Sequence, residues 1–454
     1  MKPSLAQGTR DFGAEVVAKR NYIIQIIRKH FELYGFSPLE TPAFENLETL
    51  TGKYGEEGDK LMFKILNNGL ERPEKHQKSR DEFEEVLQGK SKKGITERAL
   101  RYDLTIPFAR YVAMQAGHLN FPFKRYQIQP VWRADKPQRG RYREFYQCDA
   151  DIVGSNSLFN ESELLQLYAD VFQDLKIPVD ICINNRMILS DLAVKCGDIH
   201  LLTPMTVAID KLDKIGMNGV MTELQAKGFQ ESARQCISEF LELSKLPVHE
   251  IAPGLVQFFG EETKGIQDIK QFIALEIPGV RIDLTLARGL NYYTGTIIEV
   301  KPIGVQMGSL GGGGRYDNLT ELFDLPGISG VGISFGLDRI YDVLEETNGF
   351  PSTIQSGPQV MLVNFGPSFE SANRSILQRL RQEGISCEMY PESIKADKQL
   401  KYANKRNIPF VILIGENELK DHTITIKNFQ TGLQESFPEN EFISSVQSVI
   451  ISKL

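Results

Sequence analysis

Two runs of alternating apolar and polar residues, at about 121–133 and 143–153, constrain the fold of this 454-residue chain most strongly. The segment that joins them is short and basic and contains Pro137 and Gly140. Parallel strands need a crossover connection of about a dozen or more residues, usually a helix, and nothing of helical length separates these two runs. The sequence therefore predicts that they pair as antiparallel neighbours in a sheet.

Polar side chains are expected along one face of this sheet. Side chains alternate between the two faces of a strand, so Gln147, Asp149 and Asp151 share one face, and the residues between them are mostly apolar. Read as a strand in the same way, a shorter segment places Asp103 and Thr105 on one face. A solvated outer face would explain one such row, but two rows that mix carboxylates with amide or hydroxyl groups favour the floor of a polar pocket.

Four arginines accompany these polar rows. Arg133 and Arg141 belong to five cationic residues in the turn between the two runs, Arg288 lies beside paired tyrosines, and Arg339 follows a predicted strand-to-helix turn. An exposed basic turn would explain the first cluster, but guanidinium groups also match phosphate oxygens with a planar fork. Arginines in three segments, together with acids on strand faces, favour one site that binds an anion and a cation.

The remaining segments have simpler patterns. Residues 14–34 predict an amphipathic helix, and the two prolines within 35–45 suit extended chain at a sheet edge. Residues 67–96 are dense in charge and predict a mobile loop, for which a solvated insertion is favoured over an arm that contacts nucleic acid. The pattern between about 186 and 277 is helical. The glycine run at 311–314 either forms a flexible turn or lets backbone segments approach closely.

Composition and charge exclude several classes of protein. Hydrophobic residues make up 41% and charged residues 24%, as in ordinary globular proteins. No apolar run approaches the roughly 20 residues that span a bilayer, and the N-terminus lacks the apolar core of a signal peptide, so a cytoplasmic protein without membrane contact is expected. The five cysteines have no C-x-x-C spacing, which argues against a disulfide framework or a zinc site. A net charge of −7 argues against coating nucleic acid through bulk positive charge.

Taken together, these segments resemble the histidyl-tRNA synthetases, a family of class II aminoacyl-tRNA synthetases. The resemblance extends over essentially the whole chain. It rests on three class-level motifs at 35–45, 131–147 and 336–339, on two histidine-specific motifs at 101–105 and 287–294, and on a segment of the anticodon-binding domain around 402–406.

The resemblance implies an α+β fold, in which a class II catalytic core with an antiparallel sheet carries a helical insertion domain and a C-terminal α/β anticodon-binding domain. The implied reaction is attack of the L-histidine carboxylate on the α-phosphorus of ATP, followed by transfer of histidine to the 3′ end of tRNA(His). Mg²⁺ is expected mainly through the ATP phosphates, with no metal site from the protein alone, and a homodimer is implied. The expected boundaries are 1–185 and 277–347 for the catalytic domain, 186–276 for the insertion, 348–358 for a linker and 359–454 for the anticodon-binding domain.

The resemblance also assigns roles around ATP. Arg133 is expected to hold the α-phosphate, and Arg288 is expected to supply a second cation there, which makes these two the catalytic arginines. Arg141 and Arg339 are expected to meet the outer phosphates, with Arg339 stacking on adenine opposite Phe145. The implied nucleotide set is Arg133, Asp135, Arg141, Phe145 and Arg339.

A histidine-binding set follows from the same resemblance. Carboxylate, hydroxyl and amide groups are expected around the α-ammonium group, and the paired tyrosines are expected to reach the imidazole. The strand-face argument and the resemblance agree at Asp103, Thr105, Gln147 and Asp151. The full implied set is Asp103, Leu104, Thr105, Arg133, Gln147, Asp151, Arg288, Tyr292 and Tyr293.

Three positions depart from the family pattern. Asp103 stands where one branch of the family has Glu, although another branch has the same sequence. Asp135 replaces the usual Glu that meets the adenine and shortens its reach by one methylene. Asn291 replaces an Asp, which removes a charge beside Arg288.

Two other functions are compatible with such a sequence. One is a catalytically silent, synthetase-like protein that senses histidine or uncharged tRNA, and the other is a class II relative that charges a different amino acid. Retention of Arg133, Arg288 and Arg339, with a full C-terminal α/β segment, favours the ligase over the sensor. The segment around Arg288 argues against a different amino acid.

Overall fold

The computed structural model describes residues 2–52, 55–287, 292–429, 431–442 and 444. The chain divides into two compact units, of which the larger contains residues 1–10 and 22–349 and the smaller contains residues 11–21 and 350–454. Each unit is described by itself. None of the helices in the described ranges is both long and apolar enough to cross a membrane.

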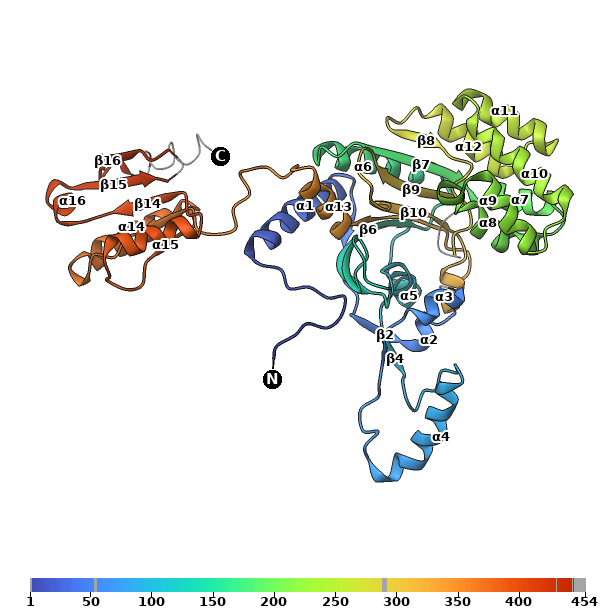
Figure 1. Ribbon diagram of the computed structural model, residues 1–454, viewed down its shortest axis with the longest axis horizontal. Coiled ribbons are helices and arrows are strands. Elements are labelled where there is room, and N and C mark those ends of the chain that lie inside the picture. The colour runs from blue at the N-terminus through green and yellow to red at the C-terminus, as the bar shows by residue number, and fades with distance from the viewer. Residues whose placement is uncertain (1, 53–54, 288–291, 430, 443, 445–454) are drawn as a thin grey trace. The chain divides into compact units, whose positions relative to one another are not determined.

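The larger unit is built on a sheet that has eight strands among the described residues (Figure 1). All neighbouring strands are antiparallel except the pairs at the two edges, which are parallel. The predicted antiparallel hairpin is confirmed, and its proline-bearing neighbour is an edge strand. Across the sheet the strands are β1 (Ser37–Pro38), β5 (Phe123–Trp132), β6 (Glu144–Val153), β11 (Gly330–Gly336), β10 (Gly311–Tyr316), β9 (Thr296–Pro302), β7 (Val179–Asn185) and β8 (Val280–Ile282).

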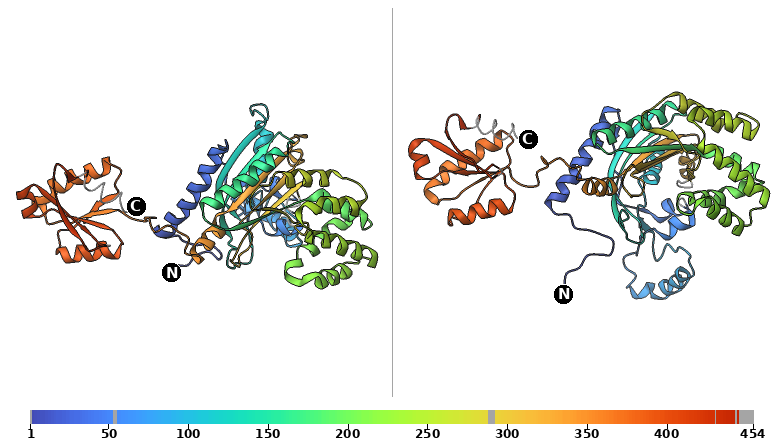
Figure 2. Two further views of the ribbon diagram at one scale, coloured as in Figure 1. Left: turned by 90° about the horizontal axis from the view of Figure 1, so that it is seen from above. Right: turned by 45° about the horizontal axis from the view of Figure 1, so that its top comes forward.

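Helices α1 (Ala14–Leu33) and α6 (Phe159–Asp174) cover one face of this sheet (Figure 2). The fully buried ring of Phe335 on β11 lies 5.9 Å from the ring of Phe31 on α1 and 4.6 Å from that of Tyr168 on α6. The apolar side of the predicted amphipathic helix thus packs on the sheet. The opposite face of the sheet contacts other elements.

Helix α5 (Thr105–Gln115) packs against that opposite face, and helix α13 (Leu337–Glu346) follows directly from β11. The prediction of a strand over 101–105 is wrong, because the preceding strand ends at Leu100 and α5 begins at Thr105. Asp103 Oδ1 accepts a hydrogen bond from the backbone N of Ile106 at 3.2 Å, which satisfies one of the free donors of the first helical turn. This local hydrogen bonding, which favours a helix start, overrides the alternating pattern.

A small antiparallel sheet carries the charged insertion. The prediction of a loop over 67–96 is wrong for twelve of these residues, which form helix α4 (His76–Leu87). Side chains one turn apart stabilise this helix, through an ion pair between Lys78 and Glu82 at 3.8 Å and a hydrogen bond from Gln77 to Asp81 at 2.9 Å. Its Lys, Glu, Arg and Gln residues are good helix formers even though none of the residues in this described helix is buried. The elements are β2 (Phe44–Asn46), α2 (Leu47–Leu50), α3 (Gly55–Lys60), β3 (Lys64–Ile65), η1 (Pro73–Lys75), α4 (His76–Leu87) and β4 (Arg98–Leu100).

The glycine run forms strand β10, so the alternative of a flexible turn is wrong. A Cβ atom at Gly313 would lie 2.2 Å from the carbonyl oxygen of Gly332, and one at Gly314 would lie 2.5 Å from that of Thr296. Real Cβ atoms do not approach backbone so closely, and only glycine lets the three neighbouring strands come together here.

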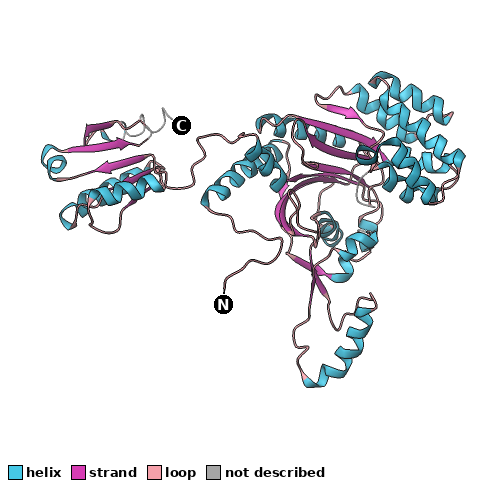
Figure 3. Cartoon of the chain, viewed as in Figure 1, coloured by secondary structure: helices cyan, strands magenta, loops and turns pink. Residues whose placement is uncertain are grey.

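A block of helices connects β7 to β8, in the segment where the sequence pattern is helical (Figure 3). Its first helix packs against its last, which returns the chain to the sheet. The helices and 3-10 turns are α7 (Arg186–Lys195), η2 (Ile199–Leu201), α8 (Leu202–Ile209), α9 (Leu212–Ala226), α10 (Glu231–Glu242), η3 (Leu243–Lys245), α11 (Val248–Phe259) and α12 (Lys264–Ala274).

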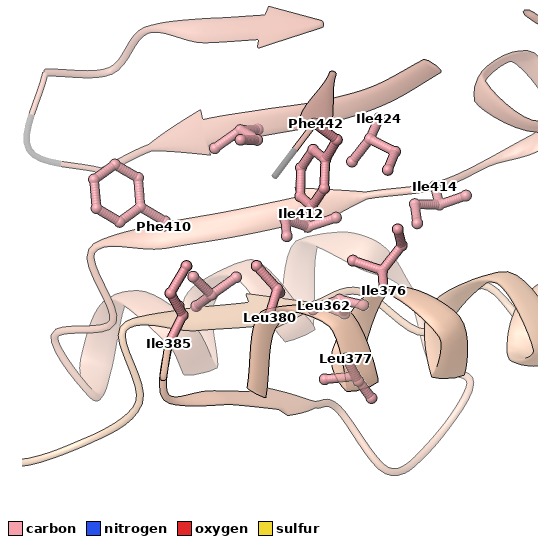
Figure 4. Packing of buried hydrophobic residues seen from close by; sticks show 12 residues of the cluster. Leu362, Ile376, Leu377, Leu380, Ile385, Phe410, Ile412, Ile414, Ile424 and Phe442 are labelled. Atoms are coloured by element: carbon pink, nitrogen blue, oxygen red, sulfur yellow. The ribbon is translucent and has the colours of Figure 1, made fainter. Parts of the chain in front are cut away.

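The smaller unit is the expected α/β arrangement, with a mixed sheet of order β13–β12–β14–β15–β16 among the described residues. Ile376 and Leu380 meet Leu362 and Ile412 in its apolar core, together with Phe442 (Figure 4). The elements are β12 (Val360–Leu362), η5 (Pro367–Phe369), α14 (Glu370–Gln382), β13 (Cys387–Met389), α15 (Ala396–Lys405), β14 (Phe410–Leu413), α16 (Glu416–Asp421), β15 (Thr423–Asn428) and β16 (Gln434–Pro438).

We predict that Phe335→Ala destabilises the larger unit by about 3–5 kcal/mol, the usual cost of deleting a buried aromatic ring. Phe159→Ala is the control, since the Phe159 side chain is 66% exposed and its loss removes little packing. Urea denaturation of both variants measures the difference. Equal shifts of the unfolding midpoint would contradict the packing described for β11.

Candidate active site

A cavity of about 810 Å³ opens on the side of the sheet opposite α1 and α6. Strands β6, β9, β10 and β11 contribute to its lining, as do the turn between β5 and β6 and the first two helices of the helical block. Of the residues predicted from the sequence, the cavity brings together Arg133, Asp135, Arg141, Phe145, Gln147, Tyr293 and Arg339.

Arg133 is held in place by aromatic rings and a backbone carbonyl. Its Nε donates to the carbonyl oxygen of Tyr102 at 3.0 Å, and its guanidinium lies 4.3 Å from the centre of the Tyr102 ring. The centre of the Phe145 ring also lies near this guanidinium, at a distance of 5.2 Å. These contacts fix the cation without neutralising it, so its charge stays available to an anion in the cavity. Sequence reasoning gave Tyr102 no role at this site.

Two more arginines extend the positive charge along the cavity. Arg339 Nε donates to the carbonyl oxygen of Gly140 at 2.8 Å, and its Nη1 donates to that of Ser309 at 2.7 Å. These bonds tie α13 to the turn between β5 and β6. Arg141, in the same turn, has an exposed side chain at the cavity. These three arginines of the cavity come from two segments far apart in the sequence.

The N-terminal segment also holds this turn. Arg143 donates its backbone N–H to the carbonyl oxygen of Gly8 at 3.0 Å. Arg10 forms an ion pair with Asp338 on α13, and its guanidinium lies 3.3 Å from the centre of the Tyr142 ring. Segments from three parts of the sequence thus fix the geometry of the arginine-bearing turn.

The carboxylates lie beneath the cavity. Asp151 pairs with Arg125 Nη2 at 2.8 Å and accepts a hydrogen bond from the Tyr316 hydroxyl at 2.6 Å. Asp103 accepts a hydrogen bond from the Tyr292 hydroxyl at 3.2 Å. The structure therefore brings the predicted acids together in one buried network, although only Gln147 of this row lines the cavity itself.

Leu104 and Thr105 take part in different ways. The side chain of Leu104 is fully buried, and its carbonyl oxygen accepts a hydrogen bond from Arg125 Nη2 at 3.4 Å. Thr105 is the buried first residue of α5. Sequence reasoning missed Arg125, which is fully buried and stands directly opposite Asp151 in the β5–β6 register. A charged residue within a largely buried run was the signal that could have revealed it.

Burial controls the acid–base properties of this floor. It raises the pKa of Asp149 to about 7, with the nearby Arg125 opposing the shift. It also raises the pKa of Asp151, which Arg125 and the Tyr316 hydroxyl oppose. Burial and the neighbouring acids raise the pKa of the Tyr293 hydroxyl, so this group stays protonated. A floor of buried carboxyl groups beneath a polar cavity suits a ligand that brings its own positive charge.

Arg288 and Asn291 lie outside the described residues. Their neighbours Ala287 and Tyr293 both line the cavity. Arg186, at the start of α7, lines it too, and no motif in the sequence singled it out.

We predict that Gly313→Ala destabilises the chain by about 1–3 kcal/mol, because the new Cβ would collide with the backbone of β11 and push it away. Gly117→Ala is the matched control, since no described atom lies within 4 Å of a Cβ at that position. Thermal or urea unfolding of the two variants provides the comparison. Equal stability would show that the close approach of β10 and β11 is not required.

Comparisons with known proteins agree with this geometry. A family model described as histidyl-tRNA synthetase matches residues 76–340, and one described as anticodon binding domain matches residues 359–449. Relatives named histidine–tRNA ligase include one from Christiangramia forsetii, 50% identical over 97% of this chain and 98% of the relative, and one from Bacteroides fragilis, 48% identical over 98% and 99%. The crystal structure of histidyl-tRNA synthetase from a Nostoc species matches with a TM-score of 0.81 and a sequence identity of 29%. The match covers 98% of this chain and 99% of the Nostoc chain. The chain belongs to the histidyl-tRNA synthetase family.

Proposed function

We propose that the cavity carries out the histidine–tRNA ligase reaction in two steps. Histidine and ATP first give histidyl-adenylate and pyrophosphate, and the histidyl group then passes to the 3′ end of tRNA(His). The observation that carries this proposal is that fixed arginines line a cavity of about 810 Å³ and that buried carboxylates lie beneath it. Such a cavity can hold an anionic nucleotide and a cationic amino acid side by side.

In the first step, a carboxylate oxygen of histidine attacks the α-phosphorus of ATP. The new carbon–oxygen–phosphorus anhydride forms as the bond to the leaving pyrophosphate breaks, and negative charge gathers on the α-phosphoryl oxygens. Arg133 is placed to meet this charge, and its contacts with Tyr102 and Phe145 mean that it needs little reorganisation. Arg288 is proposed as the second cation, on the family resemblance.

The rest of the nucleotide follows from the same arrangement. We assign the outer phosphates to Arg141 and Arg339, and adenine to the space between Arg339 and Phe145, with Asp135 at its edge. All four residues line the cavity. ATP is proposed to enter with Mg²⁺ held mainly by its phosphates, because phosphate oxygens are the hard ligands that Mg²⁺ prefers.

Histidine is assigned to the part of the cavity above the carboxylate floor. Asp103, Thr105, Gln147 and Asp151 are proposed to bind its α-ammonium group and neighbouring atoms, with Leu104 acting through its backbone. Tyr292 and Tyr293 are proposed to reach the imidazole. Their rings are fixed against each other at 4.9 Å, which keeps the wall on the imidazole side rigid.

Larger-scale features complete the proposal. We propose the domain boundaries 1–185 with 277–347, 186–276, 348–358 and 359–454, which are compatible with the helical block and with the separate α/β sheet. The segment matched by the anticodon-binding family is proposed to bind tRNA(His). A homodimer and a cytoplasmic location are also proposed, on the family resemblance.

The second candidate function, a silent sensor of histidine or uncharged tRNA, needs only the carboxylate floor. Such a protein has no need to keep arginines fixed where phosphates would lie. Arg133 and Arg339 are both held by backbone carbonyls at the cavity, which favours the ligase.

We predict that Arg133→Ala and Arg288→Ala each lower the rate of adenylate formation by roughly 10²-fold or more, the scale of losing one preorganised charge-stabilising donor. Arg139→Ala is the control, because this arginine lies in the same turn but forms an exposed ion pair with Glu346 outside the cavity. ATP–pyrophosphate exchange with histidine measures the rates. A near-wild-type rate for either variant would show that the arginine replaced in that variant does not act on the α-phosphate.

Charging of tRNA tests the second step. We predict that the full chain attaches labelled histidine to a tRNA(His) transcript in an ATP-dependent reaction and leaves a non-cognate transcript uncharged. Histidine binding without any charging would favour the sensor. Histidyl-adenylate formation without transfer would limit the function to the first step.

A further inference from the structure

Asp149 is a buried carboxylate to which the reaction outlined above gives no task. It is 2% exposed and lies on β6 between Gln147 and Asp151. In the sheet register it stands opposite Gln127 on β5 and Ser334 on β11. It is therefore under the centre of the floor on which histidine is proposed to lie.

A chain of neighbouring polar groups, here called the relay, leads from Asp149 through Ser334 and Gln147 to the cavity. The Gln147 side-chain amide donates to the Ser334 hydroxyl oxygen at 2.9 Å. Ser334 is the direct partner of Asp149 in the β6–β11 register, and its hydroxyl favours the ionised form of the Asp149 carboxyl group. Gln147 and Ser334 both line the cavity. Asp149 does not, so its influence on a ligand has to pass through these two groups.

The chemistry of the relay fixes its direction. An ionised carboxylate can only accept hydrogen bonds, and a hydroxyl has one proton to donate. Because the Ser334 oxygen accepts from the nitrogen of Gln147, its own proton is available to the Asp149 carboxylate opposite it. The Gln147 Oε1 atom is left buried and without a hydrogen-bond partner in the described part of the chain. An unpaired buried acceptor is costly, and it is satisfied when a ligand donor such as an ammonium group reaches it.

The charges around Asp149 point to the same ligand. Arg125 pairs with Asp151, and Asp149, Asp151 and Asp103 are three carboxyl groups close enough to influence one another. Within the described part of the chain, buried carboxyl groups gather at this floor, and they favour a cation that enters above them. Among the residues that the structure describes, the titratable groups that act on Asp149 from the surrounding elements are Arg101, Asp103, Arg125, Asp151, Tyr168 and Tyr293.

We propose that Asp149 is a positioning residue for histidine: its carboxylate orients the Ser334 hydroxyl, which orients the Gln147 amide so that Oε1 faces the α-ammonium group of the substrate. The inference rests on the proposed role of Gln147 in binding histidine. When residue 149 is neutral and able to donate, the relay can reverse, and Gln147 then turns its NH₂ group toward the ammonium group.

The relay gives the site a pH dependence with a defined sign. Burial raises the pKa of Asp149 to about 7, so the carboxylate is formed, and the relay is fixed in direction, mainly above that pH. Histidine binding therefore strengthens as the pH rises through 7. The stability of the fold responds in the opposite way. Because the pKa of Asp149 is higher in the folded protein than its unfolded value of about 3.9, protonation of Asp149 contributes to the free energy of unfolding at low pH. This contribution is lost as the pH rises through 7.

Pyrophosphate exchange with the full chain between pH 6 and 9 tests the inference. We predict that Asp149→Asn raises the KM for histidine about tenfold at pH 8, as expected for a hydrogen bond to a charged group, with little change in kcat or in the KM for ATP. The ratio of wild-type to variant kcat/KM for histidine should rise with pH through 7. Taking this ratio cancels the titration of the substrate's own imidazole.

Ser334→Ala is the second variant, because it cuts the relay and leaves Asp149 in place. We expect a similar rise in the KM for histidine, and we expect Asp149→Asn to add little in the double variant, since both changes break one relay. An unchanged histidine KM, a pH-independent ratio or fully additive effects would overturn the inference while the ligase function stands. A wild-type chain without histidine-dependent exchange would overturn the proposed function and this inference together.

Discussion

The buried ion pair between Arg125 and Asp151 is the interaction on which the candidate site depends. Both side chains are almost fully enclosed, and their charged atoms lie 2.8 Å apart. A buried carboxylate without a partner is costly enough to favour its own neutralisation. The pair joins β5 to β6 in the register that also places Gln147 and Asp149 on the cavity side. With Arg125 lost, Asp151 would lose the cation with which it pairs.

The positive charge of the cavity lies on a different side from the carboxylate floor and is held in place by a different kind of contact. Arg133 and Arg339 donate to the carbonyl oxygens of Tyr102, Gly140 and Ser309. Backbone carbonyl acceptors fix a guanidinium group without neutralising its charge, whereas an ion pair with a carboxylate of the floor would neutralise it. The cavity can therefore receive phosphates and an ammonium group at once, as a reaction between ATP and an amino acid requires.

The central elements of this site could be predicted from the sequence because they rest on local patterns. Alternation and the short connection predict the β5–β6 hairpin and the shared face of Gln147 and Asp151, and both are confirmed. The strand predicted around Asp103 is wrong because local hydrogen bonds start a helix there. The relay through Ser334 depends on the register between β6 and β11, which are far apart in the chain, and no local pattern encodes it. Arg125 pairs within the hairpin, but alternation alone does not show which charged residue of β5 is buried.

Exchange of labelled pyrophosphate into ATP, with each of the twenty amino acids in turn and without tRNA, shows whether this cavity activates histidine and histidine alone. The acidic floor and the fixed arginines are proposed to serve one reaction, the activation of histidine. We expect exchange with histidine and none with the other nineteen amino acids. Exchange with a different amino acid, or histidine binding without exchange, would contradict it.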